Sequence, residues 1–179
     1  DAKRGDIGNT SRQYAQAILG TMGCDAITIS PYMGREAIEP FIENAEKGSF
    51  ILAVTSNPTA HELQIHGGEE CALYKKVILI ANELNVLDNI GLVVGATQTE
   101  VMEDVRELSK GMPWLIPGVG TQGGDFETAL NISHQTGMGI INVSRGILYA
   151  GDGSIEDIIQ SAINYTEKIR SIIWNPVNC

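Results

Sequence analysis

Residues 90–110 read IGLVVGATQTEVMEDVRELSK, a run whose pattern changes partway along. Residues 90–95 are apolar and rich in valine, which is typical of a buried strand. Residues 98–110 repeat apolar side chains at three- and four-residue spacings, as amphipathic helices do. A strand followed by a helix is the repeating unit of a parallel sheet covered by helices.

The same unit recurs along the whole chain. Helical spacings and short apolar runs alternate without a linker or a low-complexity stretch, so we predict one domain over residues 1–179. The predicted strands are 26–30, 50–56, 90–95, 114–118 and 139–144. The predicted helices are 9–22, 35–47, 61–82, 98–110, 126–135 and 154–173.

The positions of the polar and glycine-rich residues favour a closed barrel over a doubly wound sheet. They follow nearly every strand, as in a (β/α)8 TIM barrel whose loops all meet at one mouth, whereas a doubly wound sheet concentrates them near one switch point. A complete barrel usually needs about 250 residues, and this chain has 179. We therefore expect an α/β fold, a barrel that runs from the end of strand 3 through the C-terminal helix, with roughly the first two and a half βα units absent.

Charge and cysteine content limit the kinds of partner and compartment. The chain has 22 acidic and 12 basic residues, a net charge of −10, which should repel nucleic acid and anionic membranes. We therefore expect neither as a partner. The three cysteines, Cys24, Cys71 and Cys179, have no paired spacing, which favours a reducing compartment and predicts a cytoplasmic protein.

The first ten residues, DAKRGDIGNT, bring two carboxylates and an amine together in sequence. In an extended segment the side chains of Asp1 and Lys3 point the same way, so both could enter the mouth of a barrel. Asp6 follows in a glycine-interrupted loop, where it could face the same pocket or a neighbouring subunit. The alternative is a solvated charged loop that only caps the helix at 9–22.

A glycine-rich loop, PGVGTQGGDF, spans residues 117–126. Its glycines let backbone N–H groups approach an anion closely, and the start of the following helix favours negative charge. Gln122 lies among four glycines, which favours contact with a ligand. The alternative is a flexible turn in which Asp125 caps the helix.

Arg145 follows the last predicted strand directly, in the sequence NVSRGI. Many barrels bind phosphate in the loops after strands seven and eight, and the fork of a guanidinium suits that anion. The alternative is a surface arginine paired with Asp152 or Glu156. Together with the glycine-rich loop, Arg145 would supply a positive pocket that the acidic surface otherwise lacks.

The sequence VTSNP places Ser56 and Asn57 at the end of a strand. A hydroxyl and an amide at that place could recognise a polar heterocycle through paired donors and acceptors, or they could cap the next helix. The histidines have no metal-ligand spacing, and we assign none of them to catalysis or to a metal site: His61, His66 and His134.

The motifs occur in a fixed order: DxKxxDIxNT, PYMG, TSNP, VVGAT, PGVGTQGGD and SRGI. In this order they resemble those of the orotidine 5′-monophosphate decarboxylase family, and most closely its longer type 2 branch. The DxKxxD pattern alone is shared with sugar-phosphate enzymes of the same superfamily. TSNP together with PGVGTQGGD is much more specific.

The resemblance implies a carboxy-lyase that converts orotidine 5′-monophosphate to uridine 5′-monophosphate in pyrimidine biosynthesis, with neither metal nor organic cofactor. It implies that Lys3 protonates C6 of the pyrimidine as carbon dioxide leaves, and that Asp1 is set against the substrate carboxylate. Asp6 would be donated across the interface of a homodimer. The other implied ligand contacts are Ile7 and Thr10 toward the partner's site, Ser56 at the pyrimidine, Pro117 in the substrate site, and Gln122 and Arg145 at the phosphate.

Two parts of the site that the resemblance implies have no counterpart in the chain. A second lysine of the charged network and an aspartate that holds the ribose belong to strands that would precede Asp1, so we expect the chain to be N-terminally incomplete. Two alternatives stay open. One is a magnesium-dependent sugar-phosphate decarboxylase of the same superfamily, and the other is a non-catalytic nucleotide-binding barrel.

Overall fold

Five parallel strands form the centre of the computed structural model, which describes residues 1–119 and 126–174. The strands pair in chain order, and the first and last are not paired with each other in the described part, so the sheet is open. All five predicted strands are confirmed, but each ends one or more residues earlier than expected, and β2 also begins two residues earlier. Their bounds are β1 Ala26–Ile29, β2 Gly48–Val54, β3 Ile90–Val94, β4 Trp114–Ile116 and β5 Gly139–Ile141.

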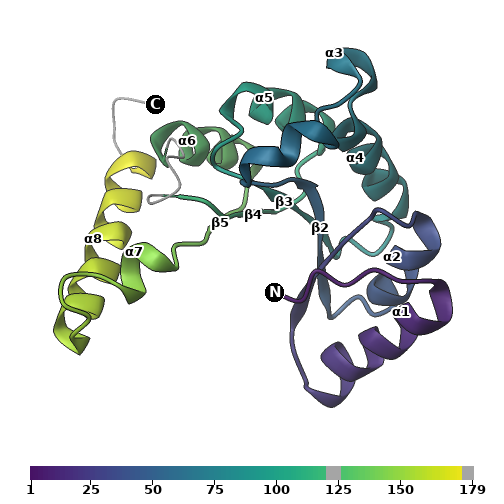
Figure 1. Ribbon diagram of the computed structural model, residues 1–179, viewed down its shortest axis with the longest axis horizontal. Coiled ribbons are helices and arrows are strands. Elements are labelled where there is room, and N and C mark those ends of the chain that lie inside the picture. The colour runs from purple at the N-terminus through teal and green to yellow at the C-terminus, as the bar shows by residue number, and fades with distance from the viewer. Residues whose placement is uncertain (120–125, 175–179) are drawn as a thin grey trace.

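Helices follow the strands and cover one face of the sheet (Figure 1). The four long helices after β2 pack in order along it, with α5 against α4 and α6, and α8 against α6. The helices are α1 Gly8–Ala15, α2 Arg35–Ile42, α3 Gly68–Cys71, α4 Leu73–Leu84, α5 Thr99–Leu108, α6 Phe126–Thr136, α7 Arg145–Leu148 and α8 Ile155–Ile173. A π-helical stretch, Gln16–Thr21, extends α1, and a 3₁₀ helix spans Pro58–Glu62.

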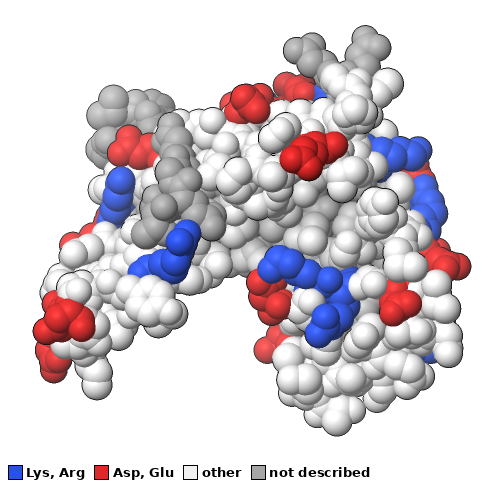
Figure 2. All heavy atoms as spheres, in the orientation of Figure 1, with Lys and Arg blue, Asp and Glu red and all other residues white. Residues whose placement is uncertain are grey.

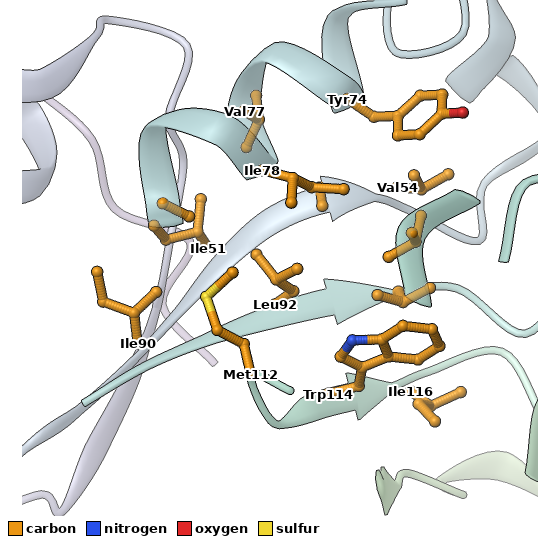
Figure 3. Packing of buried hydrophobic residues seen from close by; sticks show 14 of the residues in the cluster. Ile51, Val54, Tyr74, Val77, Ile78, Ile90, Leu92, Met112, Trp114 and Ile116 are labelled. Atoms are coloured by element: carbon orange, nitrogen blue, oxygen red, sulfur yellow. The ribbon is translucent and has the colours of Figure 1, made fainter. Parts of the chain in front are cut away.

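The hydrophobic core lies between the sheet and its helices. Figure 3 shows Ile51, Leu92 and Trp114 directed from three neighbouring strands toward Tyr74 and Ile78 of α4. All five side chains are at most 2% exposed. Successive strand residues point to opposite faces, so the residues between these core positions face the other side of the sheet.

The predicted helix at 61–82 is wrong, because two separate helices and a turn occupy that stretch. Gly67 and Gly68 adopt φ of 103° and 74°, which end any continuous helix there. The helix predicted at 35–47 stops at Ile42, and the side-chain amide of Asn89 donates to the carbonyls of Ile42, Asn44 and Lys47 as the chain turns into β2. The short helix α7 was not predicted.

The N-terminal segment runs beside the free edge of β1. Arg4 forms a single parallel bridge with Ile29. The Arg4 N–H donates to Thr28 O at 3.2 Å, and the Ser30 N–H donates to Arg4 O at 2.7 Å. The segment was expected to be the extended end of a strand. Instead Lys3 has φ 46°, in the left-handed region that non-glycine residues rarely adopt. The bridge therefore places the first residues at the carboxyl end of β1.

An ionic contact joins α4 to α5 on the outer surface. Tyr74 Oη donates to Asp104 Oδ2 at 3.1 Å, and Lys75 Nζ lies 2.6 Å from the same oxygen. The hydrogen bonds from Lys75 and Tyr74 hold the pKa of Asp104 below its usual value. The bond to Asp104 also raises the pKa of Lys75. This cluster lies outside the cavity described next.

Candidate active site

A cavity of about 530 Å³ opens at the carboxyl ends of the strands, on the face of the sheet away from the helices. Because all five strands are parallel, their ends and the loops that follow come together at this one edge. The lining residues come from the N-terminal segment, from all five strands or the loops after them, and from the turn before α3. They are Asp1, Lys3, Thr28, Leu52, Thr55, Ser56, Asn57, Gln64, Val93, Leu115, Pro117 and Asn142.

Asp1, Lys3 and Thr28 form a closed ring of polar contacts at the rim of this cavity. The Thr28 hydroxyl donates to Asp1 Oδ1 at 2.7 Å, and Asp1 Oδ2 accepts a hydrogen bond from Lys3 Nζ. The backbone N–H of Lys3 donates to Thr28 Oγ1 at 3.0 Å, which closes the ring. The predicted proximity of Asp1 and Lys3 is therefore confirmed, although the backbone between them is not extended.

The loop after β2 is held from several sides. Gln64 accepts the N–H of Thr55 at 2.7 Å and donates to the Thr55 hydroxyl at 2.8 Å, while Gln98 donates to Thr55 O at 3.1 Å. A Cβ atom added at Gly95 would lie 2.5 Å from Ser56 N, so only glycine lets β3 approach this loop. These contacts fix the backbone that carries Ser56 into the cavity.

A smaller pocket of about 130 Å³ adjoins the cavity. Arg145 lines it together with Gly118 and Ser144, and the two cavities share Ser56, Pro117 and Asn142. Helix α8 fixes the start of α7, which carries Arg145, because Ser161 Oγ donates to Gly146 O at 2.8 Å. No ion pair joins Arg145 to Asp152 or Glu156 or to any other acid in the described ranges, so its guanidinium is available to an anion.

The structure gathers five of the predicted site residues and leaves three apart. Those that line the two cavities are Asp1, Lys3, Ser56, Pro117 and Arg145. Asp6, Ile7 and Thr10 line neither cavity of their own chain. The Asp6 carboxylate accepts the N–H of Ile7 at 2.8 Å, and Ile7 is 55% exposed. Gln122 lies outside the described residues, as does Asp125.

Sequence reasoning missed four polar residues that line the cavity: Thr28, Thr55, Gln64 and Asn142. Thr28 is a polar residue at an inward-facing position of an apolar strand, and this was the one available signal for it. Asn142 follows β5, and its side chain has no hydrogen-bond partner within residues 1–119 and 126–174. Gln64 belongs to the stretch that was predicted as a continuous helix.

Side chains of both charges lie around the hollow under the sheet. Figure 2 shows Lys and Arg atoms on both walls of this hollow. Within the described ranges, no three His, Cys, Asp or Glu side chains lie close enough together to hold a metal ion. No helix in the same ranges is both long and apolar enough to cross a membrane.

Comparison with known proteins gives a consistent result. The model of the "Orotidine 5'-phosphate decarboxylase / HUMPS family" matches residues 1–156. An orotidine 5′-phosphate decarboxylase of Dehalococcoides mccartyi is 46% identical over 179 residues, covering 97% of this chain and 66% of that protein. One from Haloarcula marismortui is 48% identical over 157 residues, covering 85% of this chain and 56% of that protein.

Solved structures extend the similarity to the fold. The OMP decarboxylase of Leishmania donovani matches 97% of this chain and 67% of its own, with 34% identity and a TM-score of 0.86. The UMP synthase of the same organism matches 97% of this chain and 38% of its own, with 36% identity and a TM-score of 0.88. These neighbours are TIM barrels. The chain thus has the α/β fold predicted for part of a barrel, and it spans between 56% and 66% of the two curated relatives named above.

Proposed function

Because the chain belongs to the orotidine 5′-phosphate decarboxylase / HUMPS family, we propose that it decarboxylates orotidine 5′-monophosphate to uridine 5′-monophosphate in pyrimidine biosynthesis. One observation carries this proposal: the Asp1–Lys3 pair lines a cavity that adjoins the pocket of Arg145. A ligand with a reacting ring and a distant phosphate needs such a two-part site.

The two cavities suit the two ends of this nucleotide. The ring lies in the larger cavity against Ser56, whose hydroxyl can donate to or accept from a pyrimidine edge. The phosphate lies in the smaller pocket, where Arg145 makes charge-assisted hydrogen bonds. Pro117 and Asn142, which line both cavities, contact the ribose between these ends. Gln122 is proposed as a second phosphate contact.

The reaction breaks the bond between C6 and its carboxyl group. Carbon dioxide leaves without the bonding electrons, which stay on C6 as a carbanion, and a proton from Lys3 Nζ then forms the new C6–H bond. The Asp1 carboxylate keeps this ammonium in place and repels the substrate carboxylate beside it. The ammonium also stabilises the developing negative charge, so the step requires neither a metal ion nor an organic cofactor.

The residues that lie outside the cavity suggest a homodimer. Asp6, Ile7 and Thr10 line neither cavity of their own chain, and Ile7 exposes an apolar side chain to solvent. We assign these three residues to the site of a partner copy, where Asp6 would complete the charged network around Lys3. The net charge of −10 argues against nucleic acid or anionic membranes as partners. The three cysteines have no paired spacing, so we place the protein in a reducing compartment, the cytoplasm.

Replacement of Lys3 by alanine tests the proposed chemistry. We expect kcat for orotidine 5′-monophosphate, followed by its absorbance loss, to fall by about 10² to 10⁴ because the proton donor is removed. Binding of uridine 5′-monophosphate should change far less. Lys76→Ala removes an amine that lines neither of these two cavities and serves as the control.

The same assay separates the alternatives. Turnover that survives in Lys3→Ala would contradict the assigned role of Lys3. Loss of turnover in the parent chain on addition of a chelator would favour a magnesium-dependent sugar-phosphate enzyme. Nucleotide binding without any turnover by the longest protein that contains this chain would favour a non-catalytic barrel.

A further inference from the structure

We infer that Thr28 is a positioning residue for the reaction, because its hydroxyl fixes both the carboxylate of Asp1 and the backbone of Lys3. The inference rests on the proposed function. No sequence motif marks Thr28, and neither of its contacts is with a residue of its own strand. One hydroxyl group thus sets the geometry of the two residues to which the chemistry is assigned.

Thr28 is held firmly in the sheet, whereas Asp1 and Lys3 are not. It is 4% exposed, and β1 pairs it with Phe50 of β2 on one side, while its own carbonyl accepts Arg4 N–H on the other. Asp1 and Lys3 are much less confined, since 64% and 51% of their side-chain surfaces are exposed. An exposed ion pair alone fixes geometry poorly, because solvent competes and both side chains keep rotational freedom.

The hydroxyl has the donors and acceptors that this task needs. Its single hydrogen goes to Asp1 Oδ1, so Asp1 Oδ2 is left facing Lys3 Nζ. A lone pair of the same oxygen accepts the Lys3 N–H, which fixes the backbone at φ 46°. Without the hydroxyl, the Asp1 carboxylate can rotate and the left-handed turn at Lys3 loses a partner. The ammonium would then be misplaced relative to the reacting carbon.

A purely structural role for Thr28 predicts a different result. If Thr28 only filled space in the sheet, valine would replace it well, since valine has nearly the same shape and suits a strand. If the hydroxyl positions the reacting groups, valine should fail and serine should succeed. The comparison between these two variants therefore separates packing from hydrogen bonding.

The experiment compares Thr28→Val, Thr28→Ser and the control Thr166→Val in the full chain. Thr166 carries its hydroxyl on α8, where it donates to Ala162 O, outside the two site cavities. For Thr28→Val we expect kcat to fall about 10- to 100-fold, with little change in KM. Thr28→Ser should recover most of this loss, and Thr166→Val should match the parent.

Hydrogen exchange gives a second readout that needs no turnover. The Lys3 amide should exchange faster in Thr28→Val than in the parent and return toward the parent rate in Thr28→Ser. The inference is overturned if kcat in Thr28→Val stays at the parent value, if serine fails to rescue, or if Lys3 exchange is unchanged. If the longest protein that contains this chain has no turnover, the proposed function fails by itself, and the exchange data then decide whether Thr28 holds Lys3.

Discussion

Arg145 is the one side chain with a positive charge that lines the smaller pocket, in the part of the chain that the structure describes. Its replacement by alanine should weaken binding of uridine 5′-monophosphate about 10- to 100-fold, since a charge-assisted hydrogen bond is lost. Binding of uridine, which has no phosphate, should be unchanged. Calorimetry with both ligands checks this.

Arg170→Ala is the matched control for the Arg145 variant. Arg170 lies on α8 outside the site cavities, so its removal makes the net charge more negative by the same amount without touching the pocket. Equal losses of nucleotide affinity in the two variants would mean that Arg145 acts only through long-range charge. Equal losses for nucleotide and nucleoside in Arg145→Ala would contradict its assignment to the phosphate.

Individual site residues can be predicted from the sequence where a polar residue follows a strand. They cannot be predicted where the polar residue lies within a strand. Asp1, Lys3, Ser56 and Arg145 could be predicted because strand ends meet at one edge of a parallel sheet. Thr28 could not, since its role depends on which face of β1 it occupies and on an N-terminal segment 25 residues away in sequence. Such a pairing appears only when the register between the segments is known.

The contact between α4 and α5 makes stability depend on pH. The pKa of Asp104 is lowered in the folded chain, chiefly by the hydrogen bond from Lys75 and then by that from Tyr74. The ionised Asp104 side chain therefore contributes fully to stability at a pH above 3.8, its ordinary pKa. This contribution is lost as the pH falls through the lower pKa of Asp104 in the folded chain. Half of the Asp104 side chain is exposed, so solvent weakens the pair.

Replacement of Asp104 by asparagine should lower the melting temperature at pH 7 by about 1 to 4 °C. The difference from the parent should shrink as pH falls below 3.8, since the parent carboxylate is then protonated. Thermal melts between pH 3 and 7 measure this. Glu103→Gln is the control because its partner, Arg106, lies on the same helix. A deficit that is constant with pH would exclude an ionic origin.

Among the secondary-structure elements, the strands could be predicted from the sequence. Several helix ends could not. β2 and β3 are runs of apolar residues between turns, so both could be predicted, although β2 begins and ends two residues earlier than expected. The predicted helix over 61–82 failed because apolar spacing continues across Gly67 and Gly68, whose positive φ breaks the helix. The early end of α2 depends on Asn89, which is far away in sequence.

The molecule as a whole exposes a row of apolar side chains on its last helix. Ile155, Ile159 and Ile163 are 71%, 54% and 43% exposed and lie four residues apart, on one face of α8. Figure 1 shows α8 at one end of the molecule. Exposed apolar patches favour association, so we expect copies of the 179-residue chain to form species larger than a dimer as concentration rises.

Ile159→Lys should weaken this association about tenfold, because less apolar surface is buried when copies meet. Asn164→Lys adds the same charge on another face of the helix and should have little effect. Sedimentation velocity over a range of concentrations distinguishes the two variants. Identical behaviour of both variants and the parent would show that α8 does not mediate contacts between copies.

The left-handed backbone at Lys3 means that the residue best for folding differs from the residue that the proposed reaction needs there. Glycine adopts φ 46° without the strain that a Cβ atom brings, so folding alone would favour glycine there. The amine binds Asp1, and the proposed reaction would need it as the proton donor. A directed-evolution campaign that screens this chain for thermal tolerance or expression yield should therefore accumulate Lys3→Gly, and its most robust clones would lack the proton donor of the proposed reaction.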